Sequence, residues 1–107
     1  MSRGVIDQAL AYIGDMDELH VERITFPNFN MPAGSLGSYA TRVTVDCTKS
    51  GYTFLGCICE SIPSPGAYCC VLSAANNTAY AWIYRAQTSA LNETNHIYAY
   101  AVWKKNK

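Results

Sequence analysis

The sequence predicts an all-β protein, a single antiparallel β-sandwich of about six strands preceded by a short helical stem. Three observations support this class. The length of 107 residues suits one hydrophobic core. Apolar and polar residues alternate in several separate runs after the first seventeen residues. Turn-forming residues separate these runs roughly every ten residues, a spacing typical of antiparallel sandwiches and barrels.

The helical stem is predicted over residues 1–17, where the apolar residues follow a helical period. Ile6 and Ile13 lie one heptad apart, as do Ala9 and Met16, which gives the three-four spacing of a coiled-coil seam. Two heptads are too few to hold an isolated helix in water. The segment therefore packs on its own domain, frays, or joins copies of itself in an oligomeric stem, unless it is only a linker.

The β-domain is predicted over residues 18–107. Its strands are expected within His20–Phe29, Tyr39–Cys47, Tyr52–Cys59, Tyr68–Ser73, Ala79–Arg85 and Ile97–Trp103. Pro27 and Pro32 restrict the first of these runs to an edge position or a loop. The run Tyr52–Cys59 is apolar on both faces and is expected to be central, whereas residues 89–95 are expected to form a polar loop.

The run from Tyr39 gives the clearest alternation in the chain. The dry side, expected to face the core, carries Tyr39, Val43, Val45 and Cys47. The wet side, expected to face water, carries Arg42, Thr44 and Asp46. Further along, Asn76 and Asn77 are expected to form a tight turn, because asparagine tolerates positive φ angles.

Charge and hydropathy exclude several classes of partner. Eight basic and eight acidic residues leave no net charge, so the chain lacks the basic field that non-specific nucleic-acid binding requires. The same neutrality does not favour binding to an anionic membrane surface. No apolar stretch approaches the roughly 20 residues that cross a bilayer. The first residues lack the apolar core of a secretory signal, so no signal peptide and no export by the usual route are expected.

The cysteine pattern predicts reduced, structural thiols, with no metal ion and no other cofactor. An odd number of cysteines does not suit a complete disulfide framework. Zinc sites usually hold their cysteine pairs on turns, whereas these pairs lie inside strand-like runs, and adjacent cysteines of a strand point to opposite faces. The five residues are Cys47, Cys57, Cys59, Cys69 and Cys70.

Several common catalytic patterns are missing from the sequence, which predicts a protein that is not an enzyme. It contains no Gly-x-Ser-x-Gly elbow, phosphate-binding glycine loop or His-Glu-x-x-His motif. A thiol nucleophile would require Cys47 or Cys59 beside His96. Asp46 and Glu60 occupy separate runs and show no sign of forming an opposed carboxylate pair.

The candidate ligand-binding residues are Tyr80, Trp82, Tyr84 and Arg85. The three aromatic residues alternate along one run and therefore share a face, with Arg85 next in sequence and Asn76–Asn77 nearby. Aromatic rings pack on the C–H groups of sugars, while amides and charged groups bind the hydroxyls, so the pattern favours a glycan ligand. In the alternative interpretation, Trp82 belongs to the core and its neighbours cover a subunit interface.

The excess of apolar residues predicts a homo-oligomer. Tyr52–Cys59 and Ile97–Trp103 carry apolar side chains on both faces, whereas the outer faces of an isolated sandwich contact water. Symmetric self-association would cover this excess. In the alternative interpretation, the tyrosines simply decorate an outer face of the sheet.

The order of these sequence segments resembles that of a known protein family. The extended run Ile24–Asn28 leads through a Gly/Ser turn to an alternating strand, followed by the Ser-Gly-Tyr-Thr-x-Leu-Gly motif of Ser50–Gly56. An aromatic and aliphatic strand then runs into terminal lysines. From Glu18 to Lys105 the chain resembles the small C-terminal β-domains of phage and prophage tail-fibre, or receptor-binding, proteins of gut Firmicutes.

This resemblance implies a trimeric head domain at a fibre tip that binds a glycan of the host cell surface. It also implies that the protein is made in the bacterial cytoplasm and placed on the virion. It implies neither an enzymatic activity nor a cofactor. An alternative within the same context is a structural assembly or decoration protein of the phage or prophage particle that binds no ligand.

Overall fold

The computed structural model describes residues 18–106, and in this range every regular element longer than a single turn is a β-strand. The predicted all-β class is confirmed, whereas the predicted stem over residues 1–17 lies outside the described residues. Eight strands are present in this range: β1 (Leu19–Thr25), β2 (Phe29–Met31), β3 (Tyr39–Asp46), β4 (Tyr52–Ser61), β5 (Tyr68–Ala75), β6 (Thr78–Arg85), β7 (Leu91–Glu93) and β8 (Tyr98–Lys105).

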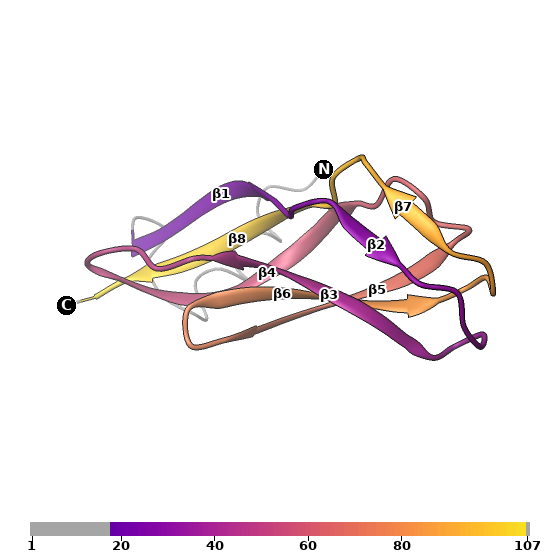
Figure 1. The fold of residues 1–107 in the computed structure, drawn as a ribbon. Helices are drawn as coiled ribbons and strands as arrows, with labels where there is room; N and C mark the ends of the chain where they lie inside the picture. The colour runs from indigo at the N-terminus through magenta and orange to yellow at the C-terminus, as the bar shows by residue number, and fades with distance from the viewer. Residues whose placement is uncertain (1–17, 107) are drawn as a thin grey trace, which may run out of the picture.

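The strands form three antiparallel sheets. Two have three strands, in the orders β1-β8-β4 and β3-β6-β5, and the third is the short pair β2-β7. Figure 1 shows the two larger sheets as two layers, with β2 and β7 at one end. Buried residues of β6 and of β8 belong to the same core cluster. The two larger sheets therefore enclose one core between them.

The number of strands differs from the six that the sequence predicts. The run His20–Phe29 is divided at Pro27, which lies between β1 and β2, because proline has no N–H group to donate to a ladder. The predicted polar loop over residues 89–95 contains β7, whose Leu91 and Glu93 lie opposite β2. A strand of three residues is too short to produce a visible alternation in the sequence.

The predicted central position of Tyr52–Cys59 is wrong. These residues belong to β4, an edge strand that pairs only with β8 in its sheet. The apolar side chains on its outer side, Leu55 and Ile58, are exposed. The strand is thus apolar on both faces, although only its inner face contacts the core and its outer face is exposed.

The core is built from small residues on the two central strands and larger residues around them. Ala79 and Ala81 of β6 and Ala99 and Ala101 of β8 are fully buried. Alanine in the middle of both sheets leaves room for large side chains from the flanking segments. The largest fully buried side chains are Tyr68, Phe26, Met31, Ile83 and Ile97.

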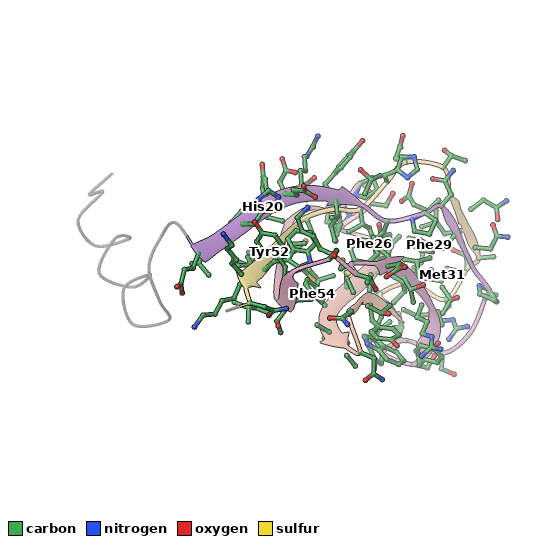
Figure 2. All side chains as sticks on the ribbon, turned by 90° about the vertical axis from the view of Figure 1, so that its left-hand side faces the viewer. His20, Phe26, Phe29, Met31, Tyr52 and Phe54 are labelled. Atoms are coloured by element: carbon green, nitrogen blue, oxygen red, sulfur yellow. The ribbon has the colours of Figure 1, made fainter. Side chains whose placement is uncertain are left out.

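An aromatic cluster around Trp103 joins the two layers at one end of the core. The Trp103 ring centroid lies 5.7 Å from those of His20 and Phe54, and its Nε1 donates a hydrogen bond of 2.7 Å to the Cys47 carbonyl. Figure 2 shows His20, Tyr52 and Phe54 close together, and Phe26, Phe29 and Met31 farther along the core. The indole therefore connects the end of β3 to the sheet that contains β8.

Positive φ angles explain the tight connections. Asn76 and Asn77 have φ angles of 52° and 62° between β5 and β6, as expected for this turn. In the Ser50–Gly56 motif, Gly51 has a φ of 81° in the turn before β4, and Gly56 has a φ of 148° at a bulge. Both glycines of the motif therefore have a backbone role.

Candidate functional site

The three aromatic residues of β6 share one face, as the sequence predicts. Ala79, Ala81 and Ile83 point into the core and are fully buried, so Tyr80, Trp82 and Tyr84 lie on the opposite face. They are half-buried, which excludes the alternative that Trp82 is a core residue. We call the outer face of the β3-β6-β5 sheet the aromatic face.

The strands beside β6 contribute the other residues of the aromatic face. On β3, Arg42 lies opposite Trp82 and Thr44 opposite Tyr80. On β5, Val71 and Ser73 lie opposite the same two rings. The aromatic face is therefore a row of rings with a cation and a hydroxyl on one side and an aliphatic residue and a second hydroxyl on the other.

A fourth ring, that of Tyr39, extends the row. The ring centroids of Tyr80 and Trp82 are 5.8 Å apart and their planes differ by 23°. The Tyr39 ring lies 5.9 Å from both Trp82 and Tyr84. The sequence assigns Tyr39 to the dry side of β3, but the pairing shifts between Tyr39 and Thr41, and Tyr39 is 50% exposed. This irregularity brings Tyr39 to the aromatic face.

Arg42 supplies the positive charge of the aromatic face. Its guanidinium carbon lies over the rings, 5.2 Å from the centroid of Tyr80 and 5.3 Å from that of Trp82. Between residues 18 and 106 it has neither an acidic partner nor a side-chain hydrogen bond, whereas Arg23 is paired with Glu60. The sequence places Arg42 on a wet face, but the pairing of β3 with β6 is needed to place it beside the rings.

Arg85, the fourth candidate binding residue, lies elsewhere. Because successive side chains of β6 point to opposite faces of the sheet, the Arg85 side chain lies on the face opposite to that of Tyr84. Its Nε donates to the Pro32 carbonyl at 2.8 Å, and its Nη1 donates to the Ser38 hydroxyl at 2.8 Å and to the Tyr39 carbonyl at 2.7 Å. Arg85 therefore holds the loop that leads into Tyr39 and acts on the aromatic face only by positioning that residue.

Removal of the Arg85 side chain tests this role. Arg85→Ala is expected to lower the free energy of unfolding by about 2 kcal/mol, because two carbonyl groups lose a charged donor. Urea denaturation followed by circular dichroism measures the change. Gly34→Ala should weaken the same contact, since a Cβ there would lie 2.6 Å from the guanidinium. Unchanged stability in both variants would contradict the assignment.

The indole of Trp82 is also fixed. Its Nε1 donates a hydrogen bond of 2.7 Å to the Ser73 hydroxyl of the neighbouring strand. A ring fixed in this way loses little conformational freedom when a ligand packs on it. The Ser73 oxygen keeps its own proton available as a donor.

The remaining chemically capable residues do not assemble into a second site in the part of the chain that the structure covers. No three His, Cys, Asp or Glu side chains there are placed to hold a metal ion. His96 is hydrogen-bonded through Nδ1 to the Phe26 carbonyl. Asp46 accepts hydrogen bonds from Thr48. Glu60 is paired with Arg23 on the other sheet, so the two carboxylates are not opposed.

Cys47, Cys57 and Cys70 are buried or partly buried, as the predicted structural role requires, whereas Cys59 and Cys69 are exposed. Cys70 lies opposite buried Ile83, whereas its neighbour Cys69 is exposed on the other side of β5. Burial raises the pKa of Cys47, Cys57 and Cys59, and raises the pKa of Cys70 to about 12. A thiol nucleophile requires the opposite shift, because the thiolate is the reactive form.

Between Glu18 and Asn106 the structure contains no helix long and apolar enough to cross a membrane. Comparisons of the chain with protein-family models, with curated proteins and with solved structures give no match.

Proposed function

We propose that the protein is a non-enzymatic receptor-binding domain, a small β-sandwich that binds a cell-surface glycan through its aromatic face. In this proposal it acts as a homotrimeric head on a phage tail fibre or a related particle. One observation carries the binding role: four partly exposed rings form a continuous row on β3 and β6, beside the guanidinium of Arg42, which has no acidic partner among residues 18–106.

The residues of the aromatic face match the chemistry of a sugar. Aromatic rings bury the C–H face of a pyranose without losing hydrogen bonds of their own. The hydroxyls of Thr44 and Ser73, which flank Tyr80 on opposite sides, can donate to or accept from sugar hydroxyls. The row follows a strand, so it suits an extended saccharide better than a compact ligand.

Arg42 favours an acidic saccharide. A guanidinium presents a rigid fork of N–H donors that fits a carboxylate or a phosphate with two parallel hydrogen bonds. Because Arg42 contacts rings and no carboxylate of residues 18–106, an anionic ligand could bind it without breaking an ion pair. A glycan that carries uronate, sialate or phosphate groups therefore fits the aromatic face best.

The test is binding of the full chain to an array that contains matched neutral and acidic glycans. Arg42→Gln is expected to weaken binding to acidic glycans roughly 10- to 100-fold, the value of a charged hydrogen bond, and binding to neutral glycans much less. Arg42 is exposed, so circular dichroism should show an unchanged fold.

Arg23→Gln is the matched control. Arg23 also lies over a tyrosine ring, 3.9 Å from the centroid of Tyr98, but on the other sheet and paired with Glu60. It should leave glycan binding unchanged. Binding of no glycan by the native protein, or equal losses in both variants, would contradict the proposal.

A structural assembly protein without a ligand is the second candidate. The observation that favours it is an exposed apolar surface on the sheet opposite the aromatic face, formed by residues such as Leu55 and Ile58. The same glycan array separates the two functions, because a purely structural protein should bind none of the glycans.

A further inference from the structure

Two cysteines from different sheets lie on the core-facing sides of their strands. Cys59 of β4 pairs with Ala99 of β8, and Cys70 of β5 pairs with Ile83 of β6. Ala99 and Ile83 are fully buried, and paired residues share a face, so both cysteines are on the inner faces of the two larger sheets. Exposed Cys69 occupies the other side of β5.

The connection between β4 and β5 brings the two cysteines to the same level of the sandwich. β4 ends at Ser61 and β5 begins at Tyr68, and Figure 1 shows the chain turning back between them. Cys59 lies two residues before the end of β4, and Cys70 lies two residues after the start of β5. The two strands contact each other although they belong to different sheets. Cys59 and Cys70 are therefore neighbours across the gap between the layers.

The ionisation of Cys70 agrees with this placement. Burial raises the pKa of Cys70 to about 12, and the thiols of Cys59 and Cys57 add to this shift, with Cys59 contributing more than Cys57. Between residues 18 and 106 no three His, Cys, Asp or Glu side chains are placed to hold a metal ion. The chemistry open to these thiols is therefore that of a pair.

The two thiols differ in their contact with solvent. Cys59 is exposed, whereas Cys70 is partly buried and packs against the core. In thiol–disulfide exchange the first thiol must meet an oxidant from solution, while the second only has to reach the first. The exposures of Cys59 and Cys70 match these two roles.

We propose that Cys59 and Cys70 form a disulfide bond between the two larger sheets in the presence of a disulfide oxidant of the oxidised-glutathione type. The Cys59 thiolate attacks one sulfur of the oxidant, forms a mixed disulfide and releases the first thiol. The Cys70 thiolate then attacks the Cys59 sulfur and releases the second thiol. The two cysteines together lose two protons and two electrons, and the oxidant is reduced to two thiols.

The bond would stabilise the fold without changing the aromatic face. It closes a loop around the connection over residues 62–67, and a loop of this size is expected to raise the folding equilibrium constant roughly 10- to 100-fold. The side chains of Val71 and Ser73 lie on the other side of β5, opposite Trp82 and Tyr80. The inference therefore does not depend on the proposed glycan.

Incubation of the full chain with oxidised glutathione tests the proposal. A pH of about 8.5 suits the reaction, because burial raises the pKa of both thiols and the thiolate fraction increases with pH. Cleavage after Glu60 separates Cys59 from Cys70, so mass spectrometry should find the two fragments linked. The urea midpoint of the oxidised protein should rise and return to its original value with dithiothreitol.

Each strand offers a matched control. Cys57 lies on the same face of β4 as Cys59, opposite buried Ala101, and Cys69 lies beside Cys70 on the outer face of β5. Cys57→Ser and Cys69→Ser should still give the linked fragments and the rise in the urea midpoint. Cys59→Ser and Cys70→Ser should give neither. Because Cys59 is exposed, its serine variant should fold like the native protein.

Three results would overturn the proposal. The first is an oxidised native protein whose fragments are not linked within one chain. The second is a link that persists in Cys59→Ser and is lost in Cys57→Ser or Cys69→Ser, which would show that another thiol reaches Cys70 or Cys59. The third is a linked protein with a lower urea midpoint than the reduced one, because the bond would then have to distort the sandwich in order to form.

Discussion

Trp103→Ala is expected to lower the free energy of unfolding by about 4 kcal/mol, a large part of the stability of a domain of this size. The side chain is 3% exposed and packs against His20 and Phe54. Its removal leaves a cavity between the layers and deprives the Cys47 carbonyl of its indole donor. Urea denaturation followed by far-ultraviolet circular dichroism measures the loss, and a low yield of soluble protein is expected.

Trp82 provides the control within the same chain. It is half-buried on the aromatic face, and its Nε1 bonds to the hydroxyl of exposed Ser73. Trp82→Ala is therefore expected to cost only about 1–2 kcal/mol and to abolish glycan binding in the folded protein. Losses of about 4 kcal/mol in both alanine variants would show that Trp82 contributes as much to stability as the buried indole of Trp103, which would contradict its role as a partly exposed binding residue.

Alternation along single strands could be predicted from the sequence. It places Tyr80, Trp82 and Tyr84 together, separates Cys69 from Cys70, and assigns Arg42 to a wet face. These inferences hold because the side-chain period of a strand is a local property of the backbone. The Asn76–Asn77 turn was predictable for the same reason, since the φ preference of asparagine belongs to the residue itself.

Contacts between strands could not be predicted in this way. The shift in the pairing of β3 with β6 between Tyr39 and Thr41 moves Tyr39 from the expected dry side to the aromatic face, and no sequence pattern predicts this shift. Arg85 follows Tyr84 directly in sequence, yet its partners come from a loop some fifty residues earlier. Such contacts depend on which strands pair and in which register, which a run of residues does not specify by itself.

The position of β4 shows the same limit. Apolar residues on both faces indicate that both faces avoid water, but they do not identify what covers the second face. In the single chain the second face of β4 is exposed at Leu55 and Ile58. The sequence pattern alone therefore does not distinguish a central strand from an edge strand whose outer face is apolar and exposed.

Alkaline pH is expected to destabilise the protein strongly. Burial, together with the neighbouring thiols of Cys59 and Cys57, raises the pKa of Cys70 to about 12. Burial also raises the pKa of Cys47, Cys57 and Cys59, and burial with the nearby Glu93 carboxylate raises that of Tyr68. All five groups thus hold their protons more tightly in the folded chain than in the unfolded chain.

The sign of the effect follows from this difference. When the folded pKa is the higher one, the stabilisation is complete below the unfolded pKa, near 8.5 to 9 for a thiol and near 10 for a tyrosine. It decreases as pH rises towards the folded value, because only the unfolded chain then gains by releasing protons. At pH 11 Cys70 alone should account for a loss of about 1–2 kcal/mol, after allowance for its partial contact with solvent.

Urea denaturation at a series of pH values, with a reductant present, measures this loss. Stability should be constant from about pH 7 to 8 and fall steeply above about pH 9. Cys70→Ala should flatten the fall, whereas Cys69→Ala, on the exposed side of the same strand, should leave it unchanged. The difference in stability between pH 7 and pH 10.5 is the quantity to compare, because it cancels the packing cost of each substitution. Equal flattening by the two variants would show that the Cys70 thiol is not buried between the layers.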